Sequence, residues 1–247
     1  PEADSQEARD YQELIAGLCE SYKDLENRMT GRYCDMIEYY TVWAHQIKTP
    51  IASMRLHLQS EDSELSRRLS EDLSRIEQYV EMVLCYLRLD SDTTDYVIQE
   101  YDLDSLIRQA VKKFAGSFIR KKIRLEYSPL KKRVLTDEKW LSFVLEQLLS
   151  NALKYTPSGT VRIDWEEPDT LCVRDTGIGI EPEDLPRIFD RGYTGYKGRG
   201  DKKASGIGLY LCRRICGNLG HSIRASSVPG SGTVIKIGLE RKKLEVE

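Results

Sequence analysis

The chain has 247 residues, with 37 Lys and Arg against 40 Asp and Glu, which gives a formal net charge of −3. No basic excess would draw it onto nucleic acid, so we expect no nucleic-acid partner. No stretch approaches the roughly 18 consecutive apolar residues of a membrane span. At about 150 residues per domain, the length suggests about one and a half domains, or one domain plus an extended element.

The first residues of the chain and its cysteines indicate the cellular compartment in which we expect it. The sequence begins at Pro1, without an initiator Met or an apolar signal segment, so we expect a mature or an excised fragment, and the sequence leaves open what precedes it, membrane spans included. The six cysteines are scattered and form no CxxC pair. This pattern favours reduced, buried thiols in a cytoplasmic compartment over disulfides or zinc.

Glycine divides the chain into two parts. Only two of the 17 glycines precede residue 90, whereas thirteen lie from Gly177 to Gly238. A helical first part followed by a loop-rich second part is expected, with the boundary near Asp90–Thr94.

The first part carries two apolar stripes with alternating steps of three and four. The stripe from Leu18 to Trp43, broken once at Arg32, predicts one helix over about Gln6–Gln59. Such a helix is roughly 80 Å long and needs a partner along its length. The polar run at residues 60–63 ends it, and a second stripe from Leu69 to Leu87 predicts a second helix. Two such hairpins can pair as a four-helix bundle, so we expect a homodimer.

The second part alternates β-rich runs with helical patterns, which predicts an α/β sandwich with helices on one face of a mixed sheet. The expected strands are Tyr96–Tyr101, Ile123–Tyr127, Thr160–Trp165, Leu171–Asp175, Ser222–Ser227 and Thr233–Leu239, and the expected helices are Leu103–Arg120, Glu138–Tyr155 and Gly206–Leu219.

His45 is the first candidate for chemistry. It lies two positions beyond Trp43, so if Trp43 faces a buried seam the imidazole faces outward. Pro50, five residues on, lacks the N–H that a helix needs, at a cost of about 3 kcal/mol, and loosens the backbone beside a solvent-facing nucleophile. The alternative is a surface histidine without a role. His57 and His221 lack this context and are interpreted as structural or surface residues.

Three further segments suggest a nucleotide site. Asn151, Lys154 and Tyr155 fall within about one helical turn and offer a carboxamide oxygen for a metal, an ammonium for phosphate and an aromatic platform. The same helix reads equally as an amphipathic core helix, and both interpretations can hold. Asp175 ends an apolar strand, where a carboxylate can accept from an adenine amino group while Gly177 and Gly179 allow close approach.

A second glycine motif, Ser205-Gly206-Ile207-Gly208-Leu209, opens a helix whose free N–H groups suit a polyphosphate. Between the two glycine motifs lies Gly192–Ala204, with four glycines and four cations. This segment is either a plain disordered loop or, as we favour, a lid that orders over phosphates.

Together these motifs resemble those of bacterial two-component sensor histidine kinases, over nearly the whole chain. The matching segments are the H box at His45–Pro50, the N box at Gln147–Tyr155, the G1 box at Asp175–Ile180, the F box at Ile188–Arg191 and the G2 box at Gly206–Leu209. The resemblance implies an α+β multidomain chain. A dimerisation and phosphotransfer hairpin with a coiled-coil extension would occupy residues 1–93, and a Bergerat-type (GHKL) α/β sandwich that binds ATP would occupy residues 94–247.

The resemblance also implies roles for individual residues. A His45 nitrogen would attack the γ-phosphate of ATP, and the phosphoryl group would pass to an aspartate on the receiver domain of a response regulator. Asn151 would ligate Mg²⁺, Lys154 would contact phosphate, Tyr155 would flank the nucleotide and Asp175 would fix adenine. The nucleotide-binding residues would further include Gly177, Gly179, Arg191, Gly206, Gly208 and Leu209.

Two residues depart from the family pattern and a third matches it. The H box commonly has an acidic residue after the histidine, whereas Gln46 can hydrogen-bond an imidazole and cannot take up its proton. Gln147 replaces the usual first asparagine of the N box. Thr49 matches the position that aligns water for dephosphorylation of the regulator, so we expect phosphatase activity as well.

The segment Tyr39–Ile51 is further similar to the intramembrane-sensing subgroup that partners peptide-antibiotic ABC transporters. This narrower resemblance implies the cytoplasmic portion of a bacterial inner-membrane protein, joined to a transporter through membrane helices outside the sequence. Two alternatives compete with this interpretation. One is a nucleotide-binding signalling scaffold without phosphotransfer. The other is a chaperone or mismatch-repair ATPase, in which the ATP domain comes first, whereas here a helical hairpin precedes it.

Overall fold

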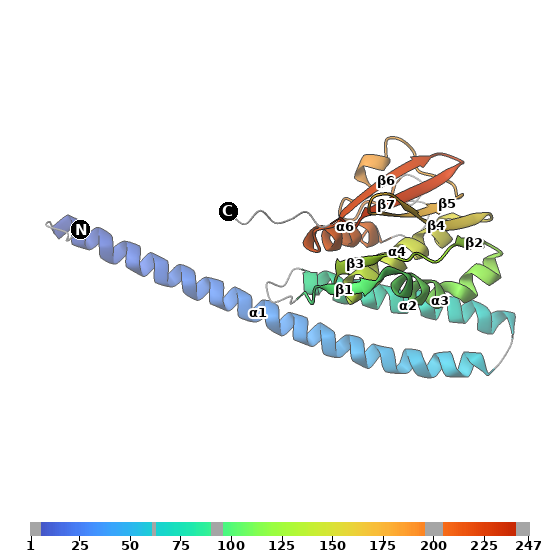
Figure 1. Cartoon of the computed structure of the whole chain (residues 1–247). Helices are drawn as coiled ribbons and strands as arrows, with labels where there is room; N and C mark the ends of the chain where they lie inside the picture. Colours follow the sequence, from blue (N-terminus) through green and yellow to red (C-terminus); the bar gives the residue numbers. More distant parts are fainter. Residues whose placement is uncertain (1–5, 61–62, 90–95, 196–204, 241–247) are drawn as a thin grey trace. The chain divides into compact units, whose positions relative to one another are not determined.

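The structure is a computed structural model that describes residues 6–60, 63–89, 96–195 and 205–240. The chain divides into two compact units, residues 1–94 and 95–247, and each is described by itself (Figure 1). Within the described residues no helix combines the length and the apolar character needed to cross a membrane.

The first unit is a helical hairpin of α1 (Gln6–Gln59) and α2 (Glu64–Leu89), as predicted. The Ser63 hydroxyl accepts from Ser66 N at 3.0 Å and caps the start of α2. At the other end of α2, the Tyr33 hydroxyl donates to the Leu87 carbonyl oxygen at 2.9 Å. The hairpin contact therefore begins near Tyr33, and in the described structure the apolar stripe of α1 before it is exposed, at Tyr11, Ile15, Leu18, Tyr22, Leu25 and Met29.

Each apolar stripe of the hairpin separates into a buried row and an exposed row. On α2, Leu73, Val80 and Leu87 are buried at seven-residue spacing, while Leu69, Ile76 and Val83 are exposed at the same spacing. On α1, Ala44 and Ile51 are buried, whereas Trp43 is exposed. The expectation that Trp43 lies in a buried seam does not hold within one chain, because a two-helix hairpin covers only the row that faces its partner helix.

The second unit contains two sheets. A two-stranded antiparallel sheet pairs β1 (Gln99–Asp102) with β3 (Arg133–Thr136). A five-stranded mixed sheet has the order β2-β4-β5-β7-β6, in which β2 and β4 are parallel and every other pair is antiparallel. Its strands are β2 (Arg124–Tyr127), β4 (Thr160–Glu166), β5 (Thr170–Asp175), β6 (Ser222–Val228) and β7 (Gly232–Gly238).

The helices α3 (Leu103–Lys121), α4 (Glu138–Tyr155) and α6 (Gly208–Asn218) lie on one side of this sheet (Figure 1). Both α4 and α6 contact its strands, and α3 packs on α4. The core lies between them, and its fully buried side chains include Leu106, Leu141, Leu148, Leu171, Leu211 and Ile237. The predicted two-layer sandwich with a mixed sheet is confirmed.

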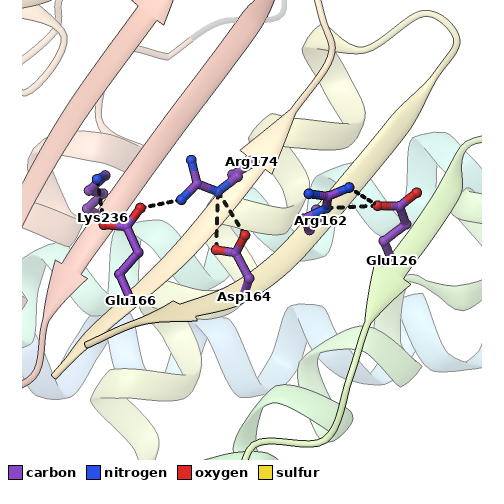
Figure 2. Close-up of polar contacts among 6 residues, drawn as sticks. All are labelled: Glu126, Arg162, Asp164, Glu166, Arg174 and Lys236. Carbon is purple, nitrogen blue, oxygen red and sulfur yellow. Dashed lines mark hydrogen bonds and ion pairs between the residues drawn. The ribbon is translucent and has the colours of Figure 1, made fainter. Parts of the chain in front are cut away.

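Ion pairs cover the opposite face of the sheet (Figure 2). Arg174 on β5 pairs with Asp164 at 2.9 Å and with Glu166, and Glu166 also accepts from Lys236 at 2.6 Å. Beneath these side chains Cys172 is fully buried, and burial raises the pKa of its thiol to about 11. The charged side chains thus shield the central strand without a second layer of helices.

Several details differ from the sequence predictions. The strand β3 and a short 3-10 helix, η1 (Leu185–Arg187), were not predicted, and α6 starts two residues later than expected. Cys19 and Cys34 are exposed, because they lie on α1 where α2 does not cover them, whereas the other four cysteines are buried as predicted. The predicted domain boundary at residues 90–94 and most of the predicted lid lie outside the described residues.

Asp137 joins the start of α4 to the segment that enters the second unit. One carboxylate oxygen accepts from Lys139 N at 2.9 Å and Trp140 N at 3.1 Å, which caps the helix. The other accepts from Val97 N at 2.9 Å. The side chain is only 5% exposed, so these three donors depend on it rather than on water.

We expect Asp137→Ala to lower the free energy of unfolding by about 1–2 kcal/mol, because it removes the cap and leaves a backbone donor unsatisfied. The matched control is Asp102→Ala at the start of α3, where an exposed side chain makes one cap bond of 3.3 Å to Asp104 N. Urea unfolding followed by circular dichroism measures both. Equal losses in the two variants would contradict the role given to Asp137.

Candidate functional site

The last two turns of α4 place Asn151, Lys154 and Tyr155 together at its surface. The leucines predicted for the core face of this helix are buried, and these three residues are half-buried. The Lys154 ammonium lies 5.1 Å from the centre of the Tyr155 ring. Both interpretations of the helix are therefore compatible in space, because the apolar and polar residues occupy different faces.

The loop after β5 lies directly against the end of α4. Ile178 N donates to the Tyr155 carbonyl oxygen at 3.1 Å. A Cβ at Gly177 would lie 2.3 Å from that same oxygen, so only glycine allows the loop to approach. At Gly179 the backbone has φ +69°, and a Cβ would meet the Val228 carbonyl oxygen at 2.2 Å. The two glycines of this motif are thus required by close packing within the chain.

Asp175 is fixed by two backbone donors from separate segments. Its Oδ1 accepts from Gly177 N at 2.9 Å and from Thr233 N at 3.3 Å. Burial raises the pKa of this carboxyl group above its ordinary value, and the two N–H groups act in the opposite direction. One carboxylate oxygen is thus occupied by the fold, which leaves the other to accept from a ligand.

Thr233 and Ser227 belong to this cluster, although neither is among the residues predicted from the sequence. Thr233 pairs with Asp175 across β5 and β7, and with Ser227 across β7 and β6. The two hydroxyl oxygens are 2.9 Å apart. In the sequence, the glycine directly before Thr233 could have pointed to this position. The structure explains that glycine, because Gly232 has φ +114° and a Cβ there would lie 1.9 Å from the Asp175 carbonyl oxygen.

The start of α6 packs on the middle of α4. A Cβ at Gly208 would lie 2.3 Å from the Gln147 side-chain nitrogen, so this glycine also permits a close helix contact. Gly206 has φ +65°, and its carbonyl oxygen accepts from Gly192 N at 2.9 Å. This bond joins the first residue of the predicted lid to the glycine motif that follows the lid. Leu209 is half-buried in the first turn of α6.

The F-box segment places its apolar residues inward and its arginine outward. Ile188 and Phe189 are buried, and Arg191 is exposed. The Arg213 guanidinium of α6 lies 6.0 Å from the Phe189 ring centre. This segment is therefore packed against α6 through Phe189.

His45 lies on the first unit and is exposed on α1, as predicted, next to the buried Ala44. Gln46 is exposed as well, and the Thr49 hydroxyl donates to the His45 carbonyl oxygen at 3.4 Å. The helix continues through Pro50 to Gln59. The structure thus presents the imidazole of His45 to solvent on a helix that Pro50 does not end.

The other two histidines differ from each other. His57 is exposed near the end of α1. His221 is buried, with its Nε2 3.1 Å from the Thr136 hydroxyl oxygen. His221 therefore links the turn before β6 to the end of β3, in agreement with its interpretation as a structural residue.

Asp175 should make stability depend on pH. Because its folded-state pKa is raised above the ordinary 3.8, the ionised form is favoured less in the folded than in the unfolded chain. The free energy of unfolding of the native chain should therefore fall, relative to Asp175→Asn, as the pH rises above 3.8 through the raised pKa. Urea unfolding of both proteins from about pH 4 to about pH 7 measures this difference. A constant difference across this range would contradict it.

Comparison with known proteins places these motifs in a family. The profile of the family described as "Histidine kinase-, DNA gyrase B-, and HSP90-like ATPase" matches residues 136–243. The sensor histidine kinase YxdK of Bacillus subtilis is 32% identical over 236 residues, covering 93% of this chain and 71% of YxdK. The sensor protein BceS of the same organism is 33% identical over 227 residues, covering 90% of this chain and 68% of BceS.

A solved structure supports the fold. The crystal structure of full-length ShkA in complex with AMPPNP aligns with 84% of this chain and 47% of its own, with a TM-score of 0.56 and 22% sequence identity. The chain spans about 70% of the length of the two curated relatives. These matches agree with the narrower resemblance to the intramembrane-sensing subgroup. With the motifs of α4, β5 and α6 joined in one sandwich and these relatives matched over most of their length, the chain belongs to the sensor histidine kinases, a family of protein-histidine kinases.

Proposed function

We propose that this chain is the catalytic core of a sensor histidine kinase that transfers the γ-phosphoryl group of ATP to His45 and then to an aspartate of a response regulator receiver domain. One observation carries the proposal. The loop with Gly177 and the start of α6 at Gly208 both pack directly on α4, the helix that bears Asn151. The loop that follows Asp175 and the N-terminus of α6 therefore both contact the helix that carries Asn151, the proposed metal ligand.

The residues present fit an adenine nucleotide with Mg²⁺. The second oxygen of Asp175 suits an exocyclic amino group, and the Lys154 ammonium suits a phosphate. Mg²⁺ retains several waters and is commonly shared between a few protein oxygens and substrate phosphates, so the Asn151 carboxamide is a sufficient protein ligand. The family profile over residues 136–243 is that of an ATPase, and the ShkA structure holds AMPPNP. Gly206, Gly208 and Leu209 would face the phosphates, with Arg191 and Tyr155 beside the nucleotide.

His45 suits the role of phosphoacceptor because its side chain is exposed on α1. In the proposed step a ring nitrogen attacks the γ-phosphorus, a phosphorus–nitrogen bond forms, and the phosphorus–oxygen bond to ADP breaks. The imidazole then loses its ring proton to solvent, since the neighbouring Gln46 cannot accept it. Catalysis rests mainly on positioning and charge neutralisation.

Thr49 would support dephosphorylation of the response regulator. It lies one helical turn after His45, and its hydroxyl donates to the His45 carbonyl oxygen, which fixes its orientation on the helix. A hydroxyl in this place can still accept from a water molecule. We therefore include phosphatase activity toward the receiver domain in the proposal.

The hairpin is proposed to pair with a second copy of itself. The exposed rows of α1 and α2 repeat at heptad spacing, which suits a four-helix bundle formed around a two-fold axis. The stripe of α1 from Tyr11 to Met29 continues that spacing as a parallel coiled coil. We accordingly assign residues 1–93 to dimerisation and phosphotransfer and residues 94–247 to ATP binding.

We base the proposed cellular location of the chain on its resemblance to the intramembrane-sensing subgroup. The intramembrane-sensing resemblance suggests the cytoplasmic portion of an inner-membrane protein that works with a peptide-antibiotic ABC transporter. Support for this comes from the segment around His45 and from the match to the sensor proteins YxdK and BceS.

The first test is incubation with γ-labelled ATP and Mg²⁺. We expect label that is acid-labile and alkali-stable, that is lost in His45→Ala and after removal of Mg²⁺ by EDTA, and that passes to a receiver domain. His57→Ala is the matched control, because His57 is also an exposed histidine on α1, and it should be labelled like the native chain. Nucleotide binding without label would instead favour the signalling scaffold.

The second test is the mass of the chain in solution. Light scattering at micromolar concentration should give twice the chain mass, and Ile76→Asp should shift it to the monomer, because a charge would enter the bundle seam. Ser74→Asp is the control, since Ser74 is exposed on the same helix outside the apolar rows. A monomeric native chain would overturn the homodimer.

A further inference from the structure

We infer that Ser227 is a positioning residue that makes the nucleotide site selective for a purine with an amino group at C6 over one with an oxo group. The inference rests on the proposed function, because it concerns the base that the site takes. Ser227 acts through Thr233, and it lies outside the five sequence motifs described above.

Three neighbouring strands place the relevant side chains in one row. Asp175 on β5 is opposite Thr233 on β7, and Thr233 is opposite Ser227 on β6. Because side chains of directly paired residues point to the same face of a sheet, all three share a face at the end of the sheet. Thr233 is therefore held between a carboxylate and a second hydroxyl.

The hydrogen bonds of Ser227 determine the direction of the Thr233 hydroxyl. A serine hydroxyl has one proton, and that of Ser227 is donated to the Gly232 carbonyl oxygen at 2.8 Å. The bond of 2.9 Å between the two hydroxyl oxygens then requires Thr233 to be the donor. With its proton committed to Ser227, the Thr233 oxygen can offer only lone pairs to a ligand.

The consequence is a ligand-facing row of acceptors. The ionised carboxylate of Asp175 also only accepts, so this edge of the sheet matches a donor such as the 6-amino group of adenine. The 6-oxo group of guanine is itself an acceptor, so it could form no hydrogen bond with these oxygens. Leaving buried polar groups unpaired costs binding free energy, so the site would bind guanine much more weakly than adenine. Selectivity thus depends on where one proton of Thr233 points.

Ser227 also holds the loop that follows Asp175. Ile180 N donates to the Ser227 oxygen at 2.9 Å, and Gly230 N donates to the Ile178 carbonyl oxygen at 2.8 Å. The loop of the G1 motif is thereby attached to the β6–β7 hairpin. The same hydroxyl that orients Thr233 therefore also fixes the segment beside Asp175.

The test compares binding of ADP and GDP to the full chain by titration calorimetry. In Ser227→Ala the Thr233 hydroxyl is free to rotate and donate, so we expect ADP to bind more weakly, GDP more tightly, and the ratio of the two affinities to fall about tenfold. Ser227→Thr keeps the hydroxyl and should restore the ratio. Ser226→Ala is the matched control, because Ser226 is adjacent, exposed and on the opposite face of β6.

A second variant keeps the inference falsifiable if Ser227→Ala folds poorly. Thr233→Val removes the oriented hydroxyl and should lower the same ratio, with no further loss when the two changes are combined. An unchanged ratio in Ser227→Ala, or an equal loss of both nucleotides, would overturn the role of Ser227. Failure of the native chain to bind ADP would overturn the proposed nucleotide site itself.

Discussion

The hydrogen bond from Ile178 N to the carbonyl oxygen of Tyr155 joins the sheet to the helix that carries the N-box residues, and the geometry of the site depends on it. It can form only because residue 177 has no side chain, since a Cβ there would lie 2.3 Å from the same oxygen. The contact brings the end of β5, and with it Asp175, beside the last turn of α4. The glycines of this motif are therefore explained first by packing within the chain. Their use in binding a nucleotide depends on that packing.

The two units differ in how their apolar surface is buried. In the sandwich, helices bury one face of the sheet, and an ion-pair network around Arg174 and Glu166 shields the other (Figure 2). In the hairpin, the row of Leu73, Val80 and Leu87 is buried within the chain, while the alternate row and the stripe at the start of α1 stay exposed. The sandwich is therefore complete as a single copy. The hairpin leaves an apolar face that a second hairpin would cover.

Much of the fold followed from local pattern. The helix over Glu138–Tyr155 has the same bounds as predicted, and the strand at Thr160 was placed within one residue, because amphipathic periodicity and flanking glycines mark such elements strongly. The strand Arg133–Thr136 was missed, since four residues in a basic segment carry no clear alternation and the strand is defined by pairing with β1. Cys19 was wrongly predicted to be buried, because the prediction used the residue type alone. The sequence does not show which part of α1 is covered by α2.

The sequence by itself determined the two-part organisation, the order of the motifs and the residue types that suit a phosphotransfer site: His45, Asn151 and Asp175. Only the tertiary structure decided which residues of the second unit lie together. Pairing across β5, β7 and β6 places Asp175, Thr233 and Ser227 in one row, although Ser227 lies 52 positions after Asp175 along the chain. The physical reason is that pairing joins strands far apart along the chain, and the local pattern of a strand does not show which other strand it will pair with.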